Sequence, residues 1–147
     1  MKSDDAEKAF MSGFNCAQSV FVPFAAQTAL GAKSAARIAS PFGGGMGKSQ
    51  QTCGAVTGGL MALGLEHGFD DASDQEGKDS VLAKTKEFMA GFKERFGTLQ
   101  CSELLGCDLN TDEGQKVYKD SNKRETTCLD CVLHAATAVE AMSRKKG

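Results

Sequence analysis

The sequence predicts an all-α protein, a single-domain helical bundle of about five to seven helices that spans residues 1–147 and contains a Gly-rich loop. Three observations support this fold class. Apolar residues recur at helical spacing along most of the chain, and no stretch alternates polar and apolar residues as a strand would. Four glycines cluster between Pro41 and Gln51, where neither a helix nor a central strand would tolerate them. A chain of 147 residues can also bury a hydrophobic core without disulfide cross-links.

The first part of the chain predicts three helical stretches before the loop. Residues 3–14 are amphipathic, residues 15–30 follow Asn15 as a candidate N-cap, and residues 34–39 are rich in alanine. Pro23 lies inside the second stretch and removes a backbone donor, so we expect a kink or a restart there.

The segment after the loop, residues 52–68, is apolar and carries small residues at positions 54, 55, 58 and 59. Glycine in a helix costs up to about 1 kcal/mol relative to alanine, so a close contact must compensate for it. We therefore expect a smooth helix face that lets another helix or a cofactor approach closely. The same face, through Gly54, Gly58 and Gly59, could instead serve a subunit interface in a homodimer.

The second half of the chain begins with a polar tract, residues 68–80, that we expect to be a solvated loop leading into a charged first turn. Gly97 is expected to end the clearest amphipathic helix, and Thr126 and Thr127 to cap the last one. Basic residues at the end of that last helix favour its C-terminus. The predicted helices of this half lie at about residues 78–96, 101–106, 112–121 and 128–146.

Composition excludes several classes of partner. The net charge of −2 and the isoelectric point near 5.7 predict no binding to nucleic acid. The N-terminal sequence is acidic where a secretory signal would be basic and then apolar, and no apolar run approaches the length of a membrane span. We therefore expect a cytoplasmic protein with no membrane insertion. In a reducing compartment, six cysteines indicate redox chemistry or metal binding more often than structural cross-links.

Four of the six cysteines share one local context. Cys16, Cys53, Cys101 and Cys128 each fall in the first turn of a predicted helix. There the unpaired backbone N–H groups and the helix dipole favour a thiolate over a thiol. Because the thiolate is both the nucleophile and the metal ligand, these four are candidates for either role.

Cys128 and Cys131 form a Cys-x-x-Cys pair, which suits an attacking and a resolving cysteine. The pair could also be half of a zinc knuckle, but its spacing from Cys101 and Cys107 does not match a standard zinc site. His134 could join Cys131 on one helix face, although a partly buried structural histidine is the more common case. We interpret His67 as a residue that caps a helix or lies at the surface.

The glycine loop is a weak candidate for phosphate binding. Gly47-Lys48-Ser49 matches the end of the Walker pattern, but Phe42 stands where its first glycine should be, and no strand precedes it. The alternative is that the loop brings its backbone close to Cys53 or to a ligand there. The candidate cofactor-binding glycines are Gly43, Gly44, Gly45 and Gly54.

With these segments assembled, the chain resembles a family of redox-active proteins named for four cysteines and a Cys-Gly-Ala-x-x-Gly motif. The segments that carry the resemblance are residues 14–18, 42–47, 53–58 and 101–106. The fourth family cysteine corresponds best to Cys128, whereas Cys131 and Cys107 lie outside the shared four. The resemblance implies a redox or cluster-related role for Cys16, Cys53, Cys101 and Cys128.

Three functions remain open from the sequence. The first is a thiol–disulfide protein in which Cys53 or Cys128 is the nucleophile and Cys131 is a candidate resolving partner for Cys128, acting with an unidentified redox partner. The second is a protein whose four shared cysteines bind an iron–sulfur cluster, zinc or another soft metal. The third is a structural module whose cysteines fill a core.

Overall fold

The structure, a computed structural model, describes residues 1–145 and the side chains of residues 1–143. The described chain is 75% helical and forms no strand, so the all-α prediction is confirmed. It has eight helices rather than five to seven, and the short segments α3, α7 and α8, each predicted to be helical, are among the eight. These helices are α1 (Lys2–Ser12), α2 (Cys16–Ala25), α3 (Gly31–Ala39), α5 (Gly54–His67), α6 (Gln75–Phe96), α7 (Cys101–Leu105), α8 (Asp112–Asp120) and α9 (Leu129–Lys145).

Three irregular elements complete the described chain. A 3₁₀ turn, η1 (Ser40–Phe42), leads into α4 (Gly43–Met46), which contains left-handed residues and is not a regular helix. A π-helical turn, η2 (Arg124–Cys128), leads directly into α9. Among the described helices, none combines enough length with enough apolar character to cross a membrane.

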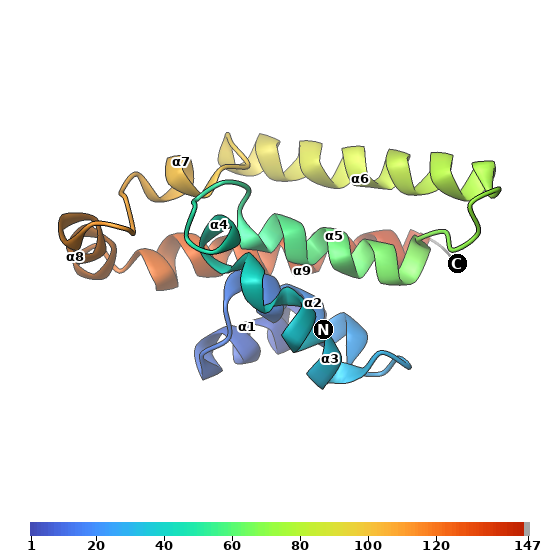
Figure 1. Ribbon diagram of the computed structural model, residues 1–147, viewed down its shortest axis with the longest axis horizontal. Helices are drawn as coiled ribbons and strands as arrows, with labels where there is room; N and C mark the ends of the chain where they lie inside the picture. The colour runs from blue at the N-terminus through green and yellow to red at the C-terminus, as the bar shows by residue number, and fades with distance from the viewer. Residues whose placement is uncertain (146–147) are drawn as a thin grey trace.

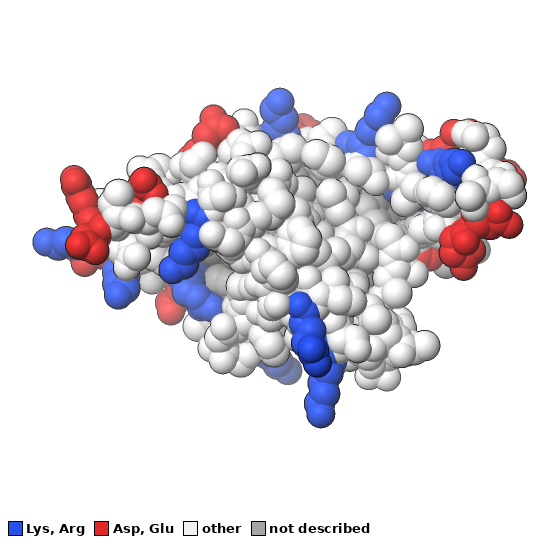
Figure 2. Space-filling model, viewed as in Figure 1, with Lys and Arg blue, Asp and Glu red and all other residues white. Residues whose placement is uncertain are grey.

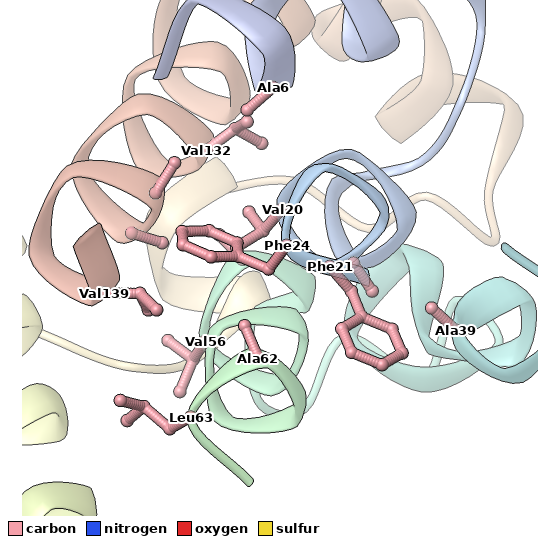
Figure 3. Close-up of a cluster of buried hydrophobic side chains, with 14 of the residues drawn as sticks. Ala6, Val20, Phe21, Phe24, Ala39, Val56, Ala62, Leu63, Val132 and Val139 are labelled. Atoms are coloured by element: carbon pink, nitrogen blue, oxygen red, sulfur yellow. The ribbon is translucent and has the colours of Figure 1, made fainter. Parts of the chain in front are cut away.

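The long helices α5, α6 and α9 run along the longest axis of the molecule, and α1, α2 and α3 lie on the side of α5 and α9 opposite α6 (Figure 1). The elements α4, α7 and α8 lie toward one end (Figure 1). The core lies where α2 packs against α5 and α9. Val20 and Phe24 from α2 meet Val56 from α5 and Val132 and Val139 from α9 (Figure 3).

The contact between α2 and α5 depends on two glycines. An added Cβ at Gly58 would lie 2.5 Å from the carbonyl oxygen of Ala17, and one at Gly54 would lie 3.1 Å from the Cβ of Cys16. Gly59 faces the ring of Phe88 on α6. The small-residue face predicted from the sequence is therefore an internal contact between helices. The prediction of a homodimer stays a prediction.

The predicted start of the second helix is confirmed. The Asn15 side chain accepts a hydrogen bond from the backbone N–H of Gln18 (2.9 Å), and the Gln18 side chain accepts one from the N–H of Asn15 (3.0 Å). The helix runs through Pro23, which removes one backbone donor, and ends at Ala25 rather than near residue 30. The Lys2 ammonium donates to the carbonyl of Pro23 (3.0 Å) and so satisfies one of the free acceptors.

The prediction for the start of the last helix is wrong. Thr126 and Thr127 do not cap it, because helical backbone is already present at residue 123 and continues through η2 into α9. The Thr126 hydroxyl bonds back to the carbonyl of Asn122 (2.9 Å) instead. Cys128 therefore lies inside a continuous helix and not in a first turn. Residue 146, included in the predicted helix, lies outside the described residues.

Candidate functional site

A pocket of about 460 Å³ opens where α2, α5 and α7 begin and η2 passes. Five of the six cysteines line it, and Cys107 does not. The five come from separate parts of the sequence and are Cys16, Cys53, Cys101, Cys128 and Cys131. The folded chain thus brings together every cysteine that the sequence singled out as a candidate.

Cys16 and Cys53 meet because two helix starts are in contact. Cys16 is the first residue of α2, and Cys53 is the N-cap of α5. Gly54 lies between them, and its missing side chain leaves room for the Cβ of Cys16 and for the carbonyl of Phe42. These two cysteines occupy helix starts as predicted.

Cys101 joins them through a short backbone pairing. The N–H of Cys53 donates to the carbonyl of Leu99 (2.8 Å), and the N–H of Cys101 donates to the carbonyl of Gln51 (2.7 Å). The single β-bridge of the described chain, between Thr52 and Gln100, lies between these two bonds. The start of α7 is thereby fixed beside the start of α5, and Cys101 occupies a helix start as predicted.

The glycine loop forms a left-handed turn at the edge of the pocket. Five consecutive residues, 44–48, have φ between 61° and 70°. This conformation costs a non-glycine residue roughly 1–2 kcal/mol, so Met46 and Lys48 are strained. An added Cβ at Gly45 would lie 2.8 Å from the Cβ of Cys101. Strain of this kind concentrates at functional sites.

The four candidate cofactor-binding glycines, Gly43, Gly44, Gly45 and Gly54, all line the pocket. The loop backbone also lies close to Asn15 and Cys101, which the sequence did not predict. An added Cβ at Gly43 would lie 2.7 Å from the Asn15 amide nitrogen, whose hydrogen bond to the carbonyl of Ser40 (3.0 Å) fixes that side chain.

Cys128 is one of the two pocket cysteines whose pKa is lowered, and it is the less buried of the two. A hydrogen bond from the thiol of Cys16 is the largest of the effects that lower the pKa of Cys128 to about 7, against the opposing effect of burial. The Tyr118 hydroxyl, 3.8 Å from the sulfur, and the charge of Arg124 lower that pKa further. At neutral pH a substantial fraction of Cys128 is therefore a thiolate.

Cys16 is the proton donor of this pair. Its hydrogen bond to Cys128 and its burial raise the pKa of Cys16 well above the ordinary value of a thiol. We assign the thiolate to Cys128 and not to Cys16, because Arg124, Lys123 and Tyr118 all favour the charged form at Cys128.

Cys53 and Cys131 form a second pair, deeper in the structure. A hydrogen bond from the thiol of Cys131 lowers the pKa of Cys53, and the backbone N–H groups of Ala55 and Val56 at the start of α5 lower it further. The hydrogen bond to Cys53 and burial raise the pKa of Cys131. Cys53 is 6% exposed and Cys131 is fully buried.

Cys101 differs from both pairs. Burial, and then the charge of Cys53, raise the pKa of Cys101 to about 12, so it is a protonated thiol at neutral pH. The helix-start position of Cys101 alone therefore does not make it a thiolate. Cys101 lines the pocket, and its role as a nucleophile or metal ligand stays a prediction.

Arg124 and Tyr118 complete the site, and the sequence did not single out either. The Arg124 guanidinium donates to the carbonyl of Phe10 (2.7 Å) and to that of Phe14 (3.2 Å), and it lies 3.9 Å from the centre of the Phe10 ring. Burial and the Cys128 charge raise the pKa of Tyr118, which keeps its hydroxyl protonated as a donor. The sequence does contain one signal for Arg124, because it precedes Cys128 by four residues. Residues at this spacing are neighbours on a helix.

Both histidines lie outside the pocket lining. The ring of His134 packs edge-on against Phe92 and Phe96, with centroid distances of 5.8 and 5.4 Å, and burial lowers the pKa of His134. The interpretation of His134 as a partly buried structural residue fits these contacts. His67 ends α5, and its Nε2 lies 3.2 Å from a carboxylate oxygen of Glu66.

The described side chains form no ready-made metal site. Within residues 1–143, no three side chains of His, Cys, Asp or Glu lie together in a way that could hold a metal ion. The four shared cysteines line one pocket but do not converge as preformed ligands. In this arrangement the four cysteines are not preformed as a ligand set for a cluster or zinc, and we derive no chemical step through one.

A family model described as "Putative redox-active protein (C_GCAxxG_C_C)" matches residues 14–142. The chain belongs to this family. In this chain the motif segment Cys-Gly-Ala-x-x-Gly begins at Cys53 and ends at Gly58. The matched region includes all five pocket cysteines. No curated protein and no solved structure matches the chain.

Proposed function

We propose that this family member is a thiol–disulfide redox protein in which Cys128 attacks a disulfide and Cys16 resolves the intermediate. The observation that carries the proposal is that Cys16, Cys128 and Arg124 line one pocket, where the side chain of Cys16 interacts with that of Cys128. A thiolate with a pKa near the ambient pH is the best attacking thiol in disulfide exchange.

The first step is the attack of the Cys128 thiolate on one sulfur of a substrate disulfide. A bond forms between Cys128 and that sulfur, the substrate S–S bond breaks, and one substrate thiolate leaves. Arg124 and Tyr118 lie on the side of Cys128 and stabilise the negative charge before the attack.

The second step uses the change in charge at Cys128. Once Cys128 is in a mixed disulfide it is neutral, so the largest cause of the raised pKa of Cys16 is gone. Cys16 then loses its proton to the leaving substrate thiolate and attacks the sulfur of Cys128. The second substrate thiolate leaves, the chain holds a Cys16–Cys128 disulfide, and two electrons have passed to the substrate.

This assignment differs from the sequence-based hypothesis in its resolving residue. Cys131 was the candidate partner of Cys128, but its thiol is hydrogen-bonded to Cys53 and fully buried. Cys16 is half-buried and hydrogen-bonded to Cys128 itself. Cys16 is therefore the better resolving residue.

A Cys16→Ser variant tests the mechanism, made in a Cys107→Ser background that removes the half-exposed thiol outside the pocket. The parent should release two equivalents of substrate thiol per Cys128 that reacts. The variant should release one equivalent and retain a mixed disulfide, seen as a mass increase of half the substrate. A matched Cys131→Ser variant should still release two. If Cys131→Ser traps the intermediate and Cys16→Ser does not, the assignment of Cys16 is wrong.

The prediction of an iron–sulfur cluster or zinc on Cys16, Cys53, Cys101 and Cys128 stays a prediction. Five cysteines lining one pocket is the feature that favours it. Anaerobic purification followed by metal analysis and a visible spectrum tests it. Bound iron or zinc that is lost in the Cys53→Ser variant would support this function and argue against disulfide exchange.

A further inference from the structure

The charge of the pocket lining points to the class of substrate. Three basic residues line the pocket, Lys48, Lys119 and Arg124, and no aspartate or glutamate is among the described residues that line it. This local excess contrasts with the net charge of −2 for the whole chain. Basic side chains gather on the surface between α8 and the middle of the molecule (Figure 2).

The three basic groups are not neutralised by carboxylates. None of them forms an ion pair with an acidic side chain in the described part of the chain. The Arg124 guanidinium bonds only neutral carbonyl groups, those of Phe10 and Phe14, and so keeps its full charge at the pocket. A cleft with charge of one sign and apolar walls concentrates ligands of the opposite sign.

The remaining lining adds an apolar surface. Leu104, Leu105 and Leu109 contribute side chains from α7 and the loop after it, and Phe10 contributes from α1. A volume of about 460 Å³ is within the range of pockets that bind small organic molecules. The pocket is therefore suited to a small molecule with both apolar and anionic parts.

We infer that the substrate of this site is a low-molecular-weight disulfide that carries acidic groups, such as carboxylates, held by Lys119, Lys48 and Arg124. This inference rests on the proposed function. The basic groups bring the anionic disulfide to Cys128, and the exchange then proceeds as described above, with two electrons passing from Cys16 and Cys128 to the disulfide. A neutral or cationic disulfide gains nothing from these charges.

The test compares three aliphatic disulfides that differ in charge: 3,3′-dithiodipropionate, bis(2-hydroxyethyl) disulfide and cystamine. Modification of Cys128 is measured in the Cys107→Ser background by peptide mass spectrometry, and each rate is divided by the rate of a neutral reference thiol. The normalised rate for the dianion should exceed that for the dication by about tenfold or more at low ionic strength. Added salt should reduce this ratio, because it screens the exposed charges.

Two variants on α8 localise the effect. Lys119→Gln should reduce the ratio of anionic to cationic rates several-fold, because Lys119 lines the pocket. Lys116→Gln removes the same charge from an exposed residue of the same helix that does not line the pocket, and it should leave the ratio unchanged. Loss of the fold would also abolish the charge preference, so both variants must show the far-UV circular dichroism spectrum of the parent before their ratios are compared.

The outcomes separate this inference from the proposed function. Equal normalised rates for the three disulfides, or a preference for cystamine, would overturn the inference and leave disulfide exchange intact. If Cys128 reacts with none of the three, the proposed function itself fails.

Discussion

In both cysteine pairs at the pocket the thiol of the partner cysteine is the largest cause of the lowered pKa, and the pairs differ in the groups that assist it. In the outer pair, Cys16 and Cys128 are both half-buried, and after Cys16 the side chains of α8 and η2 stabilise the Cys128 thiolate. In the inner pair, Cys53 and Cys131 are buried, and after Cys131 the backbone N–H groups at the start of α5 stabilise the Cys53 thiolate. Substitution of the assisting side chains can alter the pKa of Cys128, whereas the backbone contribution at Cys53 depends on the fold itself.

Exposure separates the roles of the two pairs. A substrate disulfide can reach Cys128 from the pocket, but a reaction at Cys131 requires local opening of the core. The outer pair is therefore the site of first reaction in the proposed mechanism. In that mechanism the inner pair is still reduced when the outer pair first reacts.

The largest effect should come from removing the thiolate of the outer pair. Cys128→Ser should slow the reaction of the chain with a small disulfide by about 100-fold or more, since it removes the accessible thiolate. Cys53→Ser is the matched control in the inner pair and should change this rate by less than about threefold. The measurement is stopped-flow release of substrate thiol at pH 7. Equal losses in the two variants would show that the pairs act as one unit.

The next effect concerns the contact that positions the inner pair against the outer one. Gly58→Ala would place its Cβ 2.5 Å from the carbonyl oxygen of Ala17 and force α2 and α5 apart. We expect the free energy of unfolding to fall by about 1–3 kcal/mol. Gly64→Ala, in the same helix with nothing within 4 Å, should raise it by up to about 1 kcal/mol. Denaturant titration measures both, and no loss in Gly58→Ala would contradict the packing at Ala17.

The smallest effect is on the pH dependence of the outer pair. The rate of alkylation of Cys128 should rise with pH and reach half its maximum near pH 7, because the lowered pKa yields thiolate above that pH. Tyr118→Phe and Arg124→Gln each remove a stabilising group, so the midpoint should move to higher pH. The rate at pH 7 should fall by about three- to tenfold.

Arg124 also anchors α1 through Phe10 and Phe14, so Arg124→Lys serves as a control that keeps the charge. A midpoint closer to the parent in Arg124→Lys than in Arg124→Gln assigns the shift to charge rather than to packing. An unchanged midpoint in both Tyr118→Phe and Arg124→Gln would contradict the assignment of the thiolate to Cys128.

Much of the helical fold was predictable because its signals are local. Asn15 with Gln18 three residues later predicts a helix start, and Gly97 predicts a helix end, where the structure has φ of 82°. The start of α6 was placed about three residues late, because Asp74 caps it inside a tract that composition alone assigns to a loop. Cys16, Cys53 and Cys101 were correctly placed at helix starts for the same local reasons.

The pairing of the cysteines was not predictable, because it depends on contacts distant in the sequence. The π-helical turn that carries Cys128 is anchored by Arg124 to carbonyls of Phe10 and Phe14, more than 100 residues earlier. The close approach of Cys16 to Cys53 depends on Gly54 facing α2. A Cys-x-x-Cys spacing favours Cys131 as the partner of Cys128, and only the packing of α5 against α9 places Cys131 beside Cys53.

The central claim, that Cys128 is paired with Cys16, is tested most directly by mapping the first disulfide that forms. The protein would be treated with one equivalent of a small disulfide, quenched with acid, blocked by alkylation and digested for peptide mass spectrometry. The account predicts a peptide that links Cys16 to Cys128, with Cys53 and Cys131 still reduced. A first disulfide between Cys128 and Cys131 would contradict it.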